Sequence, residues 1–104
     1  MVIRTDQAKR DLEVARTIQS QLGRAFTVMV GATNLTCGNE GGLSFLEFRF
    51  RMFPKANRLR IVLDSDDTYT LRFYRIRGAK VSVYAEESTV YADKLGETFR
   101  KVTR

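Results

Sequence analysis

An alternation of apolar and polar residues with a period of two, running from residue 43 to residue 85, constrains the fold of this chain most. Successive side chains of a strand point to opposite faces of a sheet, so each alternating segment predicts a strand with one apolar face. There are four such segments, and arginine fills many of the intervening positions. Their apolar positions are Phe48, Phe50 and Met52; Leu59, Ile61 and Leu63; Tyr69, Leu71 and Phe73; and Val81 and Val83.

Short turn-forming stretches separate the four segments. They lie at residues 54–56, at residues 65–67 and at Gly78. Pro54 has no amide donor and therefore ends its strand, while Gly78 suits a tight hairpin turn. Because parallel strands need long crossover connections, these short ones predict an antiparallel meander.

The residues before this meander predict one more strand and a loop. Phe26, Val28 and Val30 alternate with Thr27 and Met29, which favours a strand over residues 25–30. Glycine, asparagine and threonine are frequent in the stretch from Gly31 to Gly42, which predicts a long loop, either mobile or part of a binding element.

Both ends of the chain show helical spacing. Ala8, Leu12, Ala15, Ile18 and Leu22 form one apolar stripe over residues 7–22, with Thr5 or Asp6 as the cap and Gly23 as the terminator. A second apolar stripe consists of Tyr91, Leu95, Phe99 and Val102. We expect its helix to begin near Ser88 as the cap, with Glu86 and Glu87 at the positive end of the helix dipole. Each helix needs an apolar surface to cover.

The resulting prediction is one α+β domain over residues 1–104. It consists of an N-terminal helix, a five-stranded, mostly antiparallel meander sheet and a C-terminal helix, with both helices packed on one sheet face. The other face would stay open, with Glu47 as its single acidic residue. The cationic and aromatic positions expected on it are Arg49, Arg51, Arg58, Arg60, Arg72, Tyr74, Lys80 and Tyr84.

These eight residues are the candidate nucleic-acid-binding site. Guanidinium groups bind phosphates, and aromatic rings stack on bases, so the open face predicts binding of single-stranded DNA or RNA without sequence specificity. The main alternative is a protein-interaction module, either a homodimer or an inhibitor of a host protein, that uses the same face. An ordinary sheet face is also polar, so solvation alone is a third explanation.

Charge and rare residues narrow the function classes. The chain has 18 Lys and Arg against 12 Asp and Glu, a net charge of +6, which favours polyanionic partners. Cys37 is the one cysteine and histidine is absent, which excludes an intramolecular disulfide, Cys/His metal sites within one chain and catalysis by Ser/His/Asp or Cys/His groups. We therefore expect no enzyme, no cofactor and no metal site.

Carboxylates leave two weaker alternatives open. Asp64, Asp66 and Asp67 lie together and could hold Mg²⁺ or Ca²⁺, but Asp and Ser favour turns, and a turn is the simpler explanation. An enzyme that uses only carboxylates, such as Glu40, Glu47 or Asp64, is conceivable, although no spacing selects a pair.

Nothing in the sequence directs the protein out of the cytoplasm. Arg4 and Asp6 interrupt the position where a signal peptide has its apolar core, and no stretch has the ~18 apolar residues of a membrane span. We expect a cytoplasmic protein without a membrane partner.

Several short segments resemble a family of small uncharacterised proteins encoded by tailed bacteriophages. They are Gly31-Ala32-Thr33-Asn34-Leu35, Leu43-Ser44-Phe45, Ala56-Asn57, Asp67-Thr68-Tyr69 and Val90-Tyr91-Ala92-Asp93-Lys94-Leu95. The resemblance implies a phage context, hence the host cytoplasm, and functions such as DNA or RNA handling, inhibition of a host factor or a minor structural role. It implies no site residues.

Overall fold

The computed structural model describes the backbone of residues 2–51 and 53–104, and the side chains of residues 6–51 and 53–104. Met52, an expected core position, therefore lies outside the described residues, as does the side chain of the expected cap Thr5. The elements in chain order are α1 (Val2–Leu22), α2 (Arg24–Met29), β1 (Thr33–Glu40), β2 (Leu43–Arg49), β3 (Arg58–Leu63), β4 (Tyr69–Arg77), β5 (Lys80–Val90), the 3-10 turn η1 (Ala92–Lys94) and α3 (Leu95–Val102).

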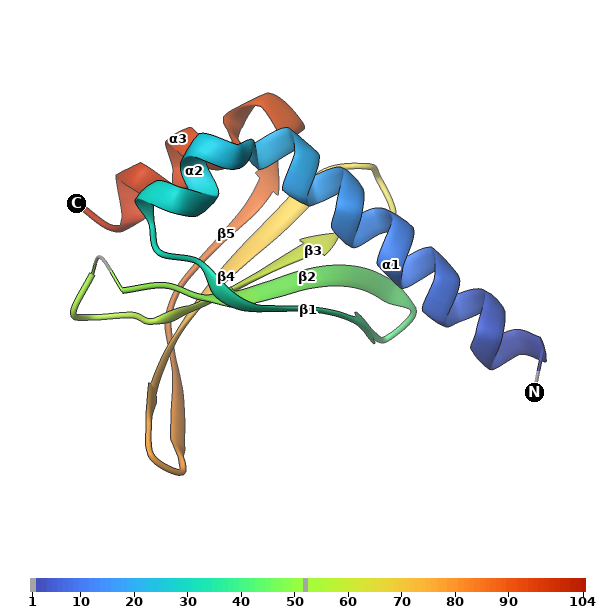
Figure 1. The fold of residues 1–104 in the computed structure, drawn as a ribbon, viewed down its shortest axis with the longest axis horizontal. Helices are drawn as coiled ribbons and strands as arrows, with labels where there is room; N and C mark the ends of the chain where they lie inside the picture. Colours follow the sequence, from blue (N-terminus) through green and yellow to red (C-terminus); the bar gives the residue numbers. More distant parts are fainter. Residues whose placement is uncertain (1, 52) are drawn as a thin grey trace.

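The five strands form one antiparallel sheet in the order β1-β2-β3-β4-β5. Helix α1 lies across β1 and β2, and α3 packs against β5, so the helices cover the same face of the sheet (Figure 1). The expected α+β architecture is confirmed. Within the described ranges, no helix has both the length and the apolar character needed to cross a membrane.

The core lies between the helices and this face of the sheet. Phe99 of α3 is its aromatic centre, with ring centroids 5.0 Å from Phe50, 5.0 Å from Phe26 and 5.9 Å from Phe73. The rings of Phe26 and Phe50 meet Phe99 edge to face, and packing of this kind stabilises a core beyond the area that it buries. The fully buried side chains include most of those that the alternation predicts on the apolar face, namely Phe48, Phe50, Leu59, Ile61, Leu71 and Phe73.

The predicted strand over residues 25–30 is wrong, because this segment forms helix α2. Phe26 and Val30 are four residues apart and so share one side of a helix, and both pack against the core. Val28 and Met29 are exposed. An alternation of only three apolar residues cannot distinguish a strand from a helix, because the first and third of them also share one side of a helix. Here the contact of Phe26 with the core favours the helix.

The fifth strand is instead β1, within the stretch for which the sequence predicts a loop. Glu40 pairs with Leu43 across a two-residue turn formed by Gly41 and Gly42, whose φ angles are 56° and 89°. Positive φ at both positions is what the favoured two-residue hairpin turn requires, and glycine adopts it without strain. The glycines therefore mark a hairpin rather than a binding loop.

The start of the C-terminal helix also differs from the prediction. Strand β5 continues to Val90, so Glu86, Glu87 and Ser88 lie in the sheet and do not cap a helix. Leu95 and Phe99 are buried as expected, whereas Tyr91 is exposed.

A buried polar contact fixes α1 on the sheet. Asp11 is buried, and its Oδ1 accepts hydrogen bonds from Ser44 Oγ of β2 at 2.7 Å and from Gln7 Nε2 at 2.9 Å. Ala15 and Ile18 fill the core one and two turns later, but Leu12 is exposed. The apolar stripe thus meets the sheet only in the C-terminal half of α1, and the N-terminal half extends past the sheet edge (Figure 1).

Candidate nucleic-acid interface

A row of charged residues crosses the open face of the sheet, one from each of four strands. Glu47 of β2 lies opposite Arg60 of β3, Arg60 lies opposite Arg72 of β4, and Arg72 lies opposite Glu86 of β5. Like charges directly opposite one another destabilise a sheet, so the central Arg60–Arg72 pair needs a counterion. Glu40, at the end of β1, supplies it.

Glu40 bridges the two arginines. Its Oε1 lies 2.7 Å from Arg60 Nη1 and 3.0 Å from Arg72 Nη1. Arg60 Nε also donates to Glu47 Oε1 at 2.8 Å, and Arg72 Nη2 lies 3.3 Å from Glu86 Oε1. We call these five residues the sheet ion-pair network.

The network changes the ionisation of its members. The hydrogen bond from Arg72 is the main cause that lowers the pKa of Glu40, against a smaller effect of burial. The same bond raises the pKa of Arg72. Burial works against the charged form of Arg60, but its hydrogen bonds to Glu47 and Glu40 outweigh burial, so the pKa of Arg60 is raised as well. These three groups therefore stay ionised at neutral pH.

The expectation that Glu47 is the single acidic residue on this face is wrong. The sequence pattern predicts a loop at Glu40 and a helix start at Glu86, so it places neither carboxylate on the sheet. Arg58 also pairs with Glu47, at 3.3 Å. Three of the predicted phosphate-binding arginines, Arg58, Arg60 and Arg72, therefore already have carboxylate partners.

The aromatic rings of the open face are also engaged. The Arg60 guanidinium lies 4.0 Å from the centroid of the Phe45 ring and 5.9 Å from that of Tyr74. The hydroxyl of Tyr74 accepts a hydrogen bond from Arg72 Nη1 at 3.2 Å. Phe45 is buried and also meets the backbone of Gly38. Neither ring is a free stacking surface.

Lys80 and Tyr84 do not lie on the predicted face. An irregularity in the pairing between Phe73 and Tyr74 brings Val83, not Tyr84, opposite Tyr74. A bulge of this kind reverses the side of the sheet that the residues beyond it occupy, here Lys80 to Val83. Tyr84 instead packs on Phe53, a member of the core cluster, with ring centroids 5.4 Å apart.

Within the described part of the sheet and its connections, the cations without carboxylate partners lie at one end. In an antiparallel meander, the end of β2, the start of β3, the end of β4 and the start of β5 all meet at that end. Among the described residues, six cations there have no carboxylate oxygen within 4.0 Å. We call them the basic end: Arg49, Arg51, Lys55, Arg75, Arg77 and Lys80.

Three of these six, Arg49, Arg51 and Lys80, are among the predicted site residues, and the prediction missed the other three. The distribution of acidic residues along the sequence could have identified these three cations, because Asp and Glu are absent from residues 48–63 and 68–85. The meander folds both acid-free segments toward the same end. Asp64, Asp66 and Asp67 lie in the β3–β4 turn, at the opposite end of the sheet.

A cleft at the basic end is lined by Arg49 and Arg51. Its volume is about 570 Å³, and Phe53, Asn57 and Ile76 also line it, with no carboxylate among its lining residues. The Asn57 side chain fixes this corner, because its amide donates to the Ile76 carbonyl and its oxygen accepts from the Ile76 amide, both at 2.9 Å. The cleft therefore has a rigid wall and cationic edges.

The aspartates of the β3–β4 turn are used by the turn itself. Asp66 Oδ1 accepts hydrogen bonds from the Thr68 amide at 3.1 Å and the Thr68 hydroxyl at 2.7 Å, which lower the pKa of Asp66. Asp64 Oδ2 accepts from the Thr70 hydroxyl at 2.7 Å. In the part of the chain that the structure describes, no three His, Cys, Asp or Glu side chains are arranged to hold a metal ion.

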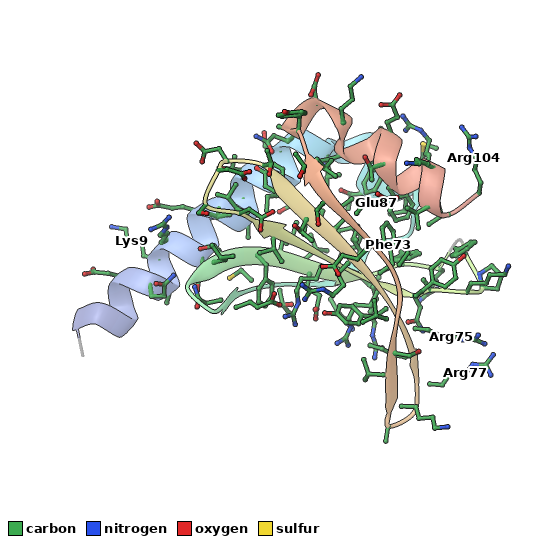
Figure 2. All side chains as sticks on the ribbon, turned by 180° about the vertical axis from the view of Figure 1, so that it is seen from behind. Lys9, Phe73, Arg75, Arg77, Glu87 and Arg104 are labelled. Atoms are coloured by element: carbon green, nitrogen blue, oxygen red, sulfur yellow. The ribbon has the colours of Figure 1, made fainter. Side chains whose placement is uncertain are left out.

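Figure 2 shows how the basic end is separated from Lys9 of α1. Arg75 and Arg77 project from the β4–β5 hairpin, whereas Lys9 lies on α1, on the other side of the molecule.

Comparisons of this chain with protein-family models, with curated proteins and with solved structures find no match.

Proposed function

We propose that this protein binds nucleic acid through phosphate contacts made by the basic end. The observation that carries the proposal is the division of the cations: those in the middle of the open face have carboxylate partners, and those of the basic end have none within the described residues. Arginine pairs well with phosphate because its planar fork can donate two parallel hydrogen bonds.

The pairing of the strands supports the same conclusion. Arg77 lies directly opposite Lys80, and Arg49 directly opposite Arg58. Like charges in these positions lower stability, and at Arg77 and Lys80 no carboxylate of the described residues offsets the repulsion. An anionic partner would remove that repulsion on binding.

Fluorescence anisotropy with labelled oligonucleotides at several salt concentrations tests the proposal. The variant Arg49→Glu/Arg51→Glu should abolish or strongly weaken binding. The matched control Lys9→Glu/Arg10→Glu changes the net charge by the same amount on the exposed side of α1 and should bind nearly as well as the wild type. Equal loss in both variants would show attraction by net charge alone and would refute a site at the basic end.

Salt dependence gives a second readout. Each phosphate contact contributes about −0.9 to the slope of log K against log salt for duplex DNA, and about −0.7 for a single strand. Neutralising Arg49 and Arg51 with glutamine should therefore make the slope shallower by roughly 1.4 to 1.8. Salt-independent binding by the wild type would contradict phosphate contacts altogether.

A protein-interaction module is the second candidate, and one observation favours it. Val81 and Val83 are 60% and 56% exposed on the β4–β5 hairpin, where Tyr74 and Ile76 lie opposite them. Exposed apolar patches often mark protein interfaces. Light scattering would support this candidate if it gave a dimer mass that the variant Val81→Thr/Val83→Thr loses and that salt does not change.

A further inference from the structure

The distal part of β4 and β5 is a two-stranded ribbon outside the layered core. Strand β3 begins opposite Tyr74, so beyond that residue β4 is paired with β5. Among the described residues, only Asn57 bonds to β4 beyond this point on the β3 side. Gly78, with φ of 56°, starts the two-residue turn at the tip. Figure 1 shows this ribbon projecting from the sheet, away from the helices.

The two faces of the ribbon differ in chemistry. Tyr74, Ile76, Val81 and Val83 form cross-strand pairs on one face, and the valines are mostly exposed. Arg75, Arg77 and Lys80 share the opposite face with Ser82. The ribbon therefore combines an uncovered apolar surface with a row of cations that lack carboxylate partners within the described residues.

The open sheet face argues against a single-stranded ligand. Sequence-tolerant binding of single strands depends on bases that stack on exposed aromatic rings. Phe45 is buried under Arg60, whose guanidinium also lies over the Tyr74 ring at 5.9 Å, while Tyr84, which is 42% exposed, lies away from this face and edge-on to Phe53. The platform that such a ligand needs is not formed by these rings.

Resting on the proposed function, we infer that the ligand is duplex DNA and that the β4–β5 ribbon enters its major groove. That groove is about 12 Å wide and admits a two-stranded ribbon, whereas the major groove of an RNA duplex is too narrow and deep for one. The apolar face, with Val81 and Val83 near the tip, lies against the base edges and thymine methyl groups. The long side chains of Arg75, Arg77 and Lys80 extend past the ribbon edges to the flanking phosphates.

The cleft at the base of the ribbon completes the contact. Arg49 and Arg51 lie where the ribbon leaves the sheet, next to Ile76 and Gly78. A duplex that holds the ribbon in its groove would present a phosphate backbone to these two arginines. Ribbon and cleft thus act on adjacent parts of one duplex.

The experiment compares one labelled DNA duplex of about two helical turns, each of its single strands and the RNA duplex of the same sequence, at two salt concentrations. We expect the DNA duplex to bind at least about tenfold more tightly than the other three, since only its major groove admits the ribbon. Tighter or equal binding of a single strand or of the RNA duplex would overturn the inference and leave the proposed function standing. Failure of all four ligands to bind at low salt would overturn both.

Two ribbon variants separate the faces. Val81→Thr/Val83→Thr keeps the strand-forming side-chain shape and should weaken duplex binding on the order of tenfold without changing the salt slope, because it removes apolar contact alone. Arg77→Ser/Lys80→Ser should instead make the slope shallower by about 1.8. Unchanged duplex affinity in both variants, with circular dichroism as for the wild type, would refute groove insertion even if Arg49→Glu/Arg51→Glu abolishes binding.

Discussion

Glu40 is the counterion that Arg60 and Arg72 share, and replacing it with glutamine tests both the stability of the sheet and the location of the binding surface. Glutamine keeps the shape of the side chain but removes the charge. Two ion pairs, with nitrogen–oxygen distances of 2.7 and 3.0 Å, would each become a weaker hydrogen bond from a guanidinium to an uncharged amide oxygen. The two arginines, directly opposite each other, would then repel without this shared counterion.

The expected cost is moderate because the site is partly exposed. The Glu40 side chain is 35% exposed, and the side chains of Arg60 and Arg72 are 25% and 22% exposed. Partly exposed ion pairs of this kind contribute about 0.2–1 kcal/mol each, so Glu40→Gln should lower the free energy of unfolding by about 1 kcal/mol at pH 7. For a domain of this size, that corresponds to a decrease in Tm of about 4–8 °C.

The pH dependence has a definite sign. Because the pKa of Glu40 is lowered in the folded state, its contribution is present above the pKa of the unfolded chain and is lost as the pH falls through the folded value. Urea unfolding at about pH 7 and about pH 3 should therefore show a larger difference in stability between wild type and variant at the higher pH than at the lower one. Glu97→Gln, at a strongly exposed pair with Lys94, is the control and should change little at either pH.

Nucleic-acid affinity of Glu40→Gln distinguishes the two possible surfaces. If the middle of the open face bound phosphates, releasing Arg60 and Arg72 would raise the affinity well above that expected from one added unit of charge. Binding by the basic end predicts only a small increase, since the ion pairs of Glu40 are with Arg60 and Arg72. A gain of more than about tenfold would refute binding by the basic end. Equal destabilisation at both pH values would refute the role of Glu40 as an ionised counterion.

Two further substitutions test the packing. Gly38→Ala would place a Cβ 2.6 Å from Cζ of Phe45, whose ring also contacts Arg60. Overpacking should lower the free energy of unfolding by about 1–3 kcal/mol. This outweighs the roughly 0.5–1 kcal/mol by which alanine is more favourable than glycine in a strand. Thermal unfolding measures this effect, and a variant as stable as the wild type would contradict the expected overpacking. Ser44→Ala removes one donor from the buried Asp11 carboxylate and should cost about 1.5–3 kcal/mol in urea unfolding, whereas Ser82→Ala on the exposed ribbon should cost little. Equal effects of the two serine variants would show that the Asp11 contact does not hold α1 on the sheet.

The sequence was sufficient for the central strands because their alternation is long and unbroken. In β3 and β4, Leu59, Ile61, Leu71 and Phe73 are all buried on the expected face. A strand with one buried face fixes its own register, since a shift by one residue would expose every apolar side chain. Regular pairing through β2, β3 and β4 carries this register across the middle of the sheet.

The alternation failed where it was short or interrupted. Three apolar residues at positions 26, 28 and 30 fit a helix as well as a strand, and tertiary packing decided between them. In β5, the valines at positions 81 and 83 face the open side because of the bulge opposite Phe73 and Tyr74, and nothing in the local sequence marks that bulge. The prediction for Lys80 and Tyr84 failed for the same reason.

The candidate site depended on contacts between distant segments, which periodicity cannot supply. Glu40 is separated from Arg60 by 20 residues and from Arg72 by 32 residues, and it reaches them only because the β1–β2 hairpin places it across the sheet. Counting charges along the chain correctly found a basic protein but could not show which cations were paired. The pairing became visible only with the strand order and register.

The charge of this protein is best understood as a separation between the two ends of one sheet. Alternate turns of a meander lie at the same end of the sheet. The acidic residues near positions 40 and 64–67 therefore lie at one end, and the turns within the acid-free segments 48–63 and 68–85 lie at the other. A polyanion is attracted by the basic end and repelled by the acidic end, which favours approach along the direction of the ribbon. For the proposed duplex ligand, the orientation would therefore follow from strand topology, and a change of net charge on α1 should leave that orientation unaltered.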